Sequence, residues 1–90
     1  TNLINCLKHF KKIGYSILGT SEHAEAMHTE LDLNMPIIAI MGSEEEGIRE
    51  KTLEKCSEIC TLSKNKTINS LNVSVATGVI LFEIARQKLV

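Results

Sequence analysis

Apolar residues recur at helical spacing in some stretches and form short runs typical of strands in others. The changes between these two patterns mark the boundaries of the predicted elements. Near the amino end, four apolar side chains fall at helical spacing: Leu3, Ile4, Leu7 and Phe10. Lysines occupy the other side of this stretch, and Gly14 follows as a stop signal, so we predict a helix that ends there. The apolar run at 15–18 predicts a first strand, which ends at Gly19 and Thr20.

Two more strands are predicted further along the chain. Residues 21–34 are polar and predict one helical turn from Ser21 followed by a loop. Pro36 opens the clearest strand, "IIAIM" at 37–41, an unalternated apolar run typical of buried parallel sheets. Residues 59–62 predict a third strand.

The pattern predicts two further helices. Ser43 and Glu46 fit the capping box S-x-x-E, and their acidic neighbours suit the positive end of a helix dipole, so we expect a helix that runs to about Ser57. The last helix is expected from about Asn72 to Lys88. Its apolar residues spread around most of its circumference, so we expect burial on more than one side until Glu83 and residues 86–88 return to water.

Helices that alternate with short apolar strands indicate an α/β domain with a mainly parallel sheet. Ninety residues are enough for one small domain. In such sheets ligands bind beyond the carboxyl ends of the strands. Three loops lie there: Gly19 with Thr20, residues 42–44, and residues 63–72.

Composition narrows the possible functions. With 43% apolar but only 3% aromatic residues, the core must be aliphatic. Ten Lys and Arg against 11 Asp and Glu give a net charge of -1. The chain therefore lacks the excess of positive charge that is typical of a protein that binds nucleic acid. A surface that binds RNA phosphates would therefore be local, or would lie on chain not included here. No apolar run is long enough to span a membrane, so we expect a cytoplasmic protein with no membrane partner.

The cysteines and histidines predict no metal site. Three cysteines (Cys6, Cys56 and Cys60) are an odd number without paired spacing, which favours a reducing compartment. Cys56 and Cys60 could join His23 or His28 around a metal ion, but two small buried apolar residues are the favoured interpretation. We expect the three histidines (His9, His23 and His28) to be surface residues.

Two loops could carry chemistry. Gly42 lets a ligand approach the backbone, and the three carboxylates after it suit a neutral or positive ligand, such as a nucleoside or a sulfonium. The alternative is that these carboxylates only cap a helix. In "NSLNVSVATG" (69–78), Ser70 and Asn72 are either an N-cap device or polar partners for a ligand.

Two stretches in order resemble the SpoU/TrmH branch of the SPOUT RNA 2′-O-ribose methyltransferases. "IIAIMGSEEEGI" (37–48) resembles their second motif, and "SLNVSVATGVILFEIARQ" (70–87) their third, in a form closest to bacterial 23S rRNA guanosine-2′-O-methyltransferases. The similarity covers essentially the whole chain. It implies an α/β fold with a C-terminal trefoil knot, a homodimer, an RNA substrate, and S-adenosylmethionine wrapped by the third-motif loop.

The resemblance also implies roles for individual residues. The cofactor would be bound by Gly42, Leu62 and Leu71, with Thr20 near its adenine side. The catalytic residues would be Glu44, Ser70 and Asn72. They would help a ribose 2′-oxygen to attack the methyl group of the cofactor, chiefly by positioning and by proton removal.

The sequence departs from the family pattern in its first motif and in its cofactor loop, and a second-motif position that is often Gly is Glu45. The first motif, with its catalytic Arg, has no counterpart, so we expect residues 1–90 to be the C-terminal portion of a catalytic domain. In the cofactor loop, Ser63-Lys64 replaces the usual Pro-Met, and Lys66 replaces a Gly. A non-catalytic remnant or dimerisation module is therefore the alternative function. An unrelated nucleotide-binding α/β fragment is a third, against which the missing Gly-rich phosphate loop counts.

Overall fold

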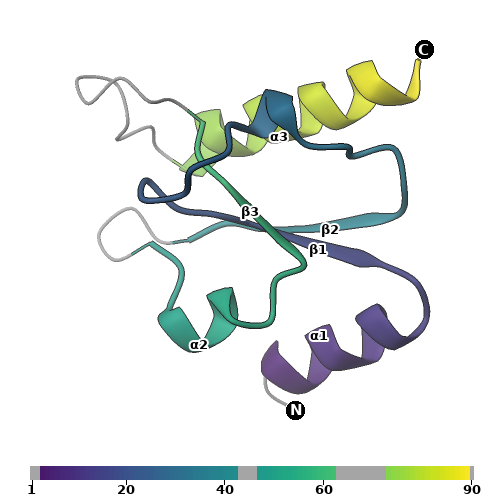
Figure 1. Ribbon diagram of the computed structural model, residues 1–90, viewed down its shortest axis with the longest axis vertical. Coiled ribbons are helices and arrows are strands. Elements are labelled where there is room, and N and C mark those ends of the chain that lie inside the picture. Colours follow the sequence, from purple (N-terminus) through teal and green to yellow (C-terminus); the bar gives the residue numbers. More distant parts are fainter. Residues whose placement is uncertain (1–2, 43–46, 63–72, 90) are drawn as a thin grey trace.

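A three-stranded parallel sheet lies between two layers of helix (Figure 1). The computed structural model describes residues 3–42, 47–62 and 73–89. Within them the elements run α1 (Leu3–Lys12), β1 (Ser16–Thr20), the 3-10 helix η1 (His28–Glu30), β2 (Ile37–Ile40), α2 (Glu50–Leu53), β3 (Glu58–Cys60) and α3 (Val73–Lys88). The predicted α/β fold with a parallel sheet is confirmed.

β1 is the central strand of the sheet, whose order is β2-β1-β3. Ser16 pairs with Ile37, and Thr20 pairs with Cys60, both in parallel register. The central position explains why β1 is buried along its middle, whereas β2 is only half-buried at every position. All three strands therefore end at the same edge of the sheet, on the left of Figure 1.

The two faces of the sheet are covered by different helices. α3 and η1 lie over one face, and α1 and α2 lie over the other (Figure 1). Leu18 of β1 belongs to the core under α3, together with Leu33, Cys60 and Ile80. Since neighbouring residues of a strand point to opposite faces, Gly19 faces the α2 layer.

The predicted second helix is wrong at both ends: it was expected to run to about Ser57, but α2 stops at Leu53, and its start is also misplaced. Gly47 has a positive φ of 69°, a left-handed conformation that a right-handed helix cannot contain. α2 consequently begins at Glu50, with Arg49 at its N-cap and no side-chain cap bond. The predicted capping box at 43–46 lies outside the described residues.

The segment between β1 and β2 contributes more to the fold than its polarity predicts. A hydrogen bond from the Ala24 N–H to the Ser21 carbonyl, 3.2 Å long, closes a turn where one was predicted. The helical turn itself comes later, as η1. Leu33 is 1% exposed and lies in the core, a role that a segment read only as a loop did not suggest.

α3 has close to its predicted length, but its two sides differ. Ala76, Ile80 and Glu83 are buried against the sheet layer, whereas Leu81 and Phe82 are exposed. The expectation that the helix is buried on more than one side is therefore wrong for the single chain. The expectation that Glu83 returns to water is also wrong, because Glu83 is 5% exposed.

Gly19→Ala is expected to destabilise the fold by about 1–3 kcal/mol, because the new methyl would overpack the α2 layer. A Cβ at this position would lie 2.7 Å from the Cys56 Sγ and 3.3 Å from the Leu53 Cδ2. Urea unfolding of Gly19→Ala measures the loss. Adding Cys56→Ala removes the nearest atom and should restore part of it; a double variant no more stable than Gly19→Ala would contradict this packing.

Candidate functional site at the carboxyl edge of the sheet

Three of the predicted cofactor contacts lie at the carboxyl edge of the sheet. Thr20 ends β1, Gly42 follows β2 by two residues, and Leu62 follows β3 by two residues. All three are half-buried. The pairing of Ile40 with Gly19 and of Cys60 with Thr20 brings the three strand ends together. The other predicted site residues (Glu44, Ser70, Leu71 and Asn72) lie outside the described residues.

The backbone at Gly42 is in close contact with the chain that returns at Gly47. A Cβ at Gly42 would lie 2.6 Å from the Cα of Gly47, and closer still to the Gly47 carbonyl carbon and the Ile48 nitrogen. These are backbone atoms, which cannot move aside as the end of a side chain can. Residue 42 must therefore be glycine for the two ends of the 43–46 segment to meet at the strand end.

Hydrogen bonds hold the end of β3 from both sides. The Ser21 N–H donates to the Cys60 carbonyl over 2.9 Å, next to β1. On the other side, Thr61 donates to the Ala26 carbonyl and accepts from the His28 N–H, over 2.8 and 3.0 Å. The side chain of Leu62 then packs against the core. A ligand at Leu62 would accordingly meet its backbone, as the resemblance implies.

A polar network around the buried carboxylate of Glu83 attaches α3 to the segment before β2. Arg86 donates two hydrogen bonds to the Glu83 carboxylate, both 2.8 Å long, and the Gln87 amide donates a third, 2.9 Å long. The same Gln87 amide group donates to the Leu31 carbonyl, and its oxygen accepts from the Leu33 N–H, over 2.8 and 2.6 Å. The network fixes the position of the helix that begins at Val73, directly after the third-motif polar pair.

The family of the chain follows from a family profile that matches most of its length. The sequence profile of the SpoU rRNA Methylase family matches residues 1–82. The chain belongs to this family. It is 42% identical over 88 residues to the 23S rRNA (guanosine-2′-O-)-methyltransferase RlmB of Pseudomonas aeruginosa, which covers 98% of the chain but only 36% of that protein. The chain thus spans about a third of the length of the curated relatives that it matches.

Solved structures of SpoU proteins share the fold. An RNA 2′-O ribose methyltransferase superposes on the whole chain with a TM-score of 0.87 and 31% identity, over 35% of its own length. The A. aeolicus TrmH/SpoU tRNA modifying enzyme superposes on 98% of the chain with a TM-score of 0.86 and 32% identity, over 45% of its length. The predicted resemblance is confirmed.

The carboxylate of Glu83 is buried, which the sequence pattern did not predict. The hydrogen bonds from Arg86 and then Gln87 lower the pKa of Glu83 from 4.5 to about 2, and nearby His28 adds to the effect. The spacing of Glu83, Arg86 and Gln87 at i, i+3 and i+4 was a signal for such a network. Because these three residues lie near the end of the last helix, we expected them to be exposed to solvent instead.

Glu83→Gln is expected to lower the melting temperature at neutral pH, because a neutral amide replaces the charge-assisted bonds to Arg86. A carboxyl with a lowered pKa stabilises the fold above its unfolded pKa of 4.5, and this contribution is lost as pH falls towards about 2. The melting-temperature difference between the wild type and the variant should therefore be constant above pH 5 and shrink below it. A difference that stays the same across this range would contradict the role of the charge.

The three histidines differ in their exposure to solvent, and Cys60 is buried. His9 and His23 are exposed, as predicted, but His28 is buried in η1, which packs against α3. Burial raises the pKa of the Cys60 thiol to about 11, as expected of an inert buried cysteine. Among the residues that the structure describes, no group of three or more His, Cys, Asp or Glu could hold a metal ion, and no helix could cross a membrane.

Proposed function

We propose that this chain binds S-adenosylmethionine and serves in the 2′-O-methylation of a guanosine ribose in 23S rRNA, in the cytoplasm. The proposal rests on one observation: Thr20, Gly42 and Leu62 lie at the same edge of the sheet. The chain that carries them matches the SpoU family over residues 1–82. This is the edge at which parallel α/β sheets bind ligands. The 42% identity to RlmB of Pseudomonas aeruginosa supports guanosine as the substrate nucleotide.

The proposed cofactor site works mainly through the backbone. Gly42, Leu62 and Leu71 would hold S-adenosylmethionine through main-chain atoms, and Thr20 would lie near its adenine, as the resemblance implies. Glu44 and its acidic neighbours suit the positive sulfonium of the cofactor. A phosphate-bearing cofactor would be repelled by the same carboxylates.

In the proposed reaction, the ribose 2′-oxygen attacks the methyl carbon of the sulfonium. The new oxygen–carbon bond would form as the carbon–sulfur bond breaks, S-adenosylhomocysteine would leave, and the 2′-hydroxyl proton would pass to water. Glu44, Ser70 and Asn72 hold the nucleoside and the cofactor in line, since positioning is the main source of rate in such a transfer. We propose that residues 1–90 are the C-terminal portion of the catalytic domain, and that the catalytic Arg of the first motif comes from outside this chain.

The exposed side of α3 supports a homodimer as the assembled form. Val75, Leu81, Phe82 and Leu89 are 48, 57, 74 and 87% exposed. Val75, Leu81 and Phe82 on α3, with Leu89 just beyond its end, form an apolar stripe opposite the buried side of the helix, and they include one of the three aromatic residues of the chain. Such a stripe is typical of a protein interface. A second copy of α3 would cover it and would provide the second buried side that the sequence predicts.

Methyl transfer to ribosomal RNA tests the proposed function. The longest natural protein that contains this chain is incubated with tritiated S-adenosylmethionine and unmodified 23S rRNA, and the product nucleoside is identified by mass spectrometry. We expect 2′-O-methylguanosine, whereas residues 1–90 alone should bind the cofactor and transfer nothing. A natural protein that binds S-adenosylmethionine but methylates no RNA would favour the non-catalytic dimerisation module, which the lysines at 64 and 66 also favour.

A further inference from the structure

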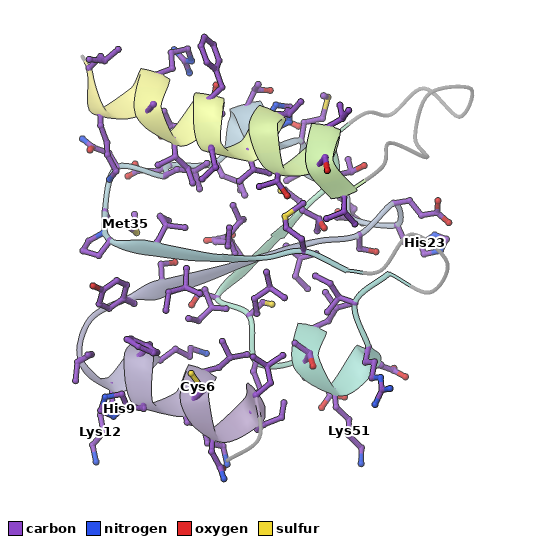
Figure 2. All side chains as sticks on the ribbon, turned by 180° about the vertical axis from the view of Figure 1, so that it is seen from behind. Cys6, His9, Lys12, His23, Met35 and Lys51 are labelled. Carbon is purple, nitrogen blue, oxygen red and sulfur yellow. The ribbon has the colours of Figure 1, made fainter. Side chains whose placement is uncertain are left out.

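One segment of the chain is attached to both of the elements that flank the proposed cofactor loop, residues 63–72. Residues 26–35, here called the bridging segment, run beside α3 from the carboxyl edge of the sheet towards the opposite edge. In Figure 2 the chain passes from His23, at the carboxyl edge, to Met35, near the C-terminal end of α3. The start of the segment pairs with Thr61, just before the loop, and its end is hydrogen-bonded to α3, which begins directly after the loop.

Before the loop, the attachment is made through the backbone. The Thr61 N–H donates to the Ala26 carbonyl, and the Thr61 carbonyl accepts from the His28 N–H, over 2.8 and 3.0 Å. Thr61 is 4% exposed, so these bonds are shielded from water. Leu62, a proposed cofactor contact, is the next residue. Its position is therefore set by main-chain hydrogen bonds.

After the loop, the attachment depends chiefly on one side chain, Gln87 of α3. The buried residues Ala76 and Ile80 hold α3 against the sheet layer by apolar contacts, which have no preferred direction. The Gln87 amide nitrogen donates to the Leu31 carbonyl over 2.8 Å, and the amide oxygen accepts from the Leu33 N–H over 2.6 Å. Hydrogen bonds are directional, so these two set the position of the helix along its axis and its rotation.

The rest of α3 carries this position to the end of the loop. Val73, the first residue of the helix, lies roughly 21 Å along the axis from Gln87, at about 1.5 Å per residue. Glu83 fixes the Gln87 side chain further, because its carboxylate accepts from the same amide over 2.9 Å. The bond from Lys88 to the bridging segment is exposed and contributes less. A shift of the helix at Gln87 therefore moves Val73, whereas Leu62 stays in place.

We propose that Gln87 is a positioning residue for the cofactor site. By holding α3 against the bridging segment, it sets the position of Val73 relative to Leu62. It thereby sets the backbone that the residues between them offer to S-adenosylmethionine. The inference rests on the proposed function, which assigns cofactor contacts to Leu62 and Leu71. Gln87 acts from the opposite end of α3, through the helix, and not by touching the cofactor.

Gln87→Met tests the proposal, because methionine keeps the length and the helix propensity of the side chain but removes the amide hydrogen bonds. S-adenosylmethionine is titrated calorimetrically into the full chain, at a temperature at which the variant is folded. We expect the dissociation constant to rise about 10-fold, a factor typical of coupling between distant groups. The melting temperature should fall by about 4–8 °C.

Ser57→Ala is the matched control. It also removes the side-chain partner of a half-buried backbone N–H, because the Ile17 N–H donates to the Ser57 Oγ over 3.1 Å. Ser57 directly precedes β3, at the opposite edge of the sheet from the proposed site. Its melting temperature should fall by a similar amount, while its cofactor affinity should stay that of the wild type. If Gln87→Met binds the cofactor as tightly as Ser57→Ala, Gln87 only stabilises the fold and the proposal is wrong.

Hydrogen exchange of the wild type tests the same coupling, and it decides the matter if Gln87→Met does not fold. Coupling is reciprocal, so a cofactor that binds more tightly when Gln87 is in place must also hold Gln87 in place. S-adenosylmethionine should therefore slow exchange of the Leu33 N–H, which donates to Gln87, about 10-fold. It should not slow the Tyr15 N–H, which donates to the Phe10 carbonyl in the opposite layer. Equal slowing at both sites, or none at Leu33, would overturn the proposal.

The same titrations separate this proposal from the proposed function. A folded wild type that binds no S-adenosylmethionine would overturn both. If the wild type binds the cofactor and Gln87→Met binds it equally well, the positioning role of Gln87 is wrong and the proposed function stands.

Discussion

Gly42→Ala is expected to weaken S-adenosylmethionine binding about 5- to 150-fold, the factor that corresponds to an overpacking cost of roughly 1–3 kcal/mol at the site. The added methyl would meet the backbone of Gly47 and Ile48, with the Gly47 Cα only 2.6 Å away. The two backbones must therefore separate at the end of β2. Calorimetric titration of the cofactor measures the change.

Gly19→Ala is the matched control for this variant. It also inserts a methyl into a crowded place, but its neighbours are the side chains of Cys56 and Leu53 under the sheet, not the backbone of a site loop. We expect it to lose stability and to keep most of its cofactor affinity. If Gly42→Ala bound the cofactor as tightly as the wild type, the close contact with Gly47 would have no part in the site.

Phe82→Glu is expected to convert the proposed homodimer into a monomer. Phe82 is 74% exposed in the single chain, so the change should cost the monomer little. In a dimer it would remove about 1.5–3 kcal/mol of apolar burial per chain and place a charge in the interface. The dimer dissociation constant should therefore rise about 100-fold or more, as measured by sedimentation equilibrium.

Ile13→Glu provides the comparison for the dimer. Ile13 is 57% exposed and lies beyond the end of α1, on the opposite layer of the molecule. The same change there should leave the association unaffected. A wild type that sediments as a monomer, or a Phe82→Glu variant that still dimerises, would contradict the assignment of the apolar stripe to a second copy of α3.

Local patterns predicted the elements where the determining residues are close in sequence. The helical spacing of Leu3, Ile4, Leu7 and Phe10 predicted α1, and the apolar run at 37–41 predicted β2. The rule that ligands bind beyond the carboxyl ends of parallel strands predicted that loops distant in sequence would lie at the same edge of the sheet, as Gly42 and Leu62 do.

The features that were missed depend on contacts distant in the chain or on backbone conformation. Glu83 is buried because Gln87 reaches Leu31 and Leu33, more than 50 positions earlier, and no helical pattern contains that information. His28 is buried in η1, which packs against α3 from a distant part of the sequence. The start of α2 was misplaced because a capping box does not reveal the left-handed conformation of Gly47.

The most direct test of the cofactor site is calorimetric titration of S-adenosylmethionine and S-adenosylhomocysteine into the folded chain, with Leu71→Pro as the control. We predict one site per chain for both ligands and loss of binding in Leu71→Pro, because a proline there alters the backbone that the third motif offers to the cofactor. A folded wild-type chain that binds neither ligand would contradict the proposed site, and a non-catalytic remnant of the SpoU family would then be the better account of the protein.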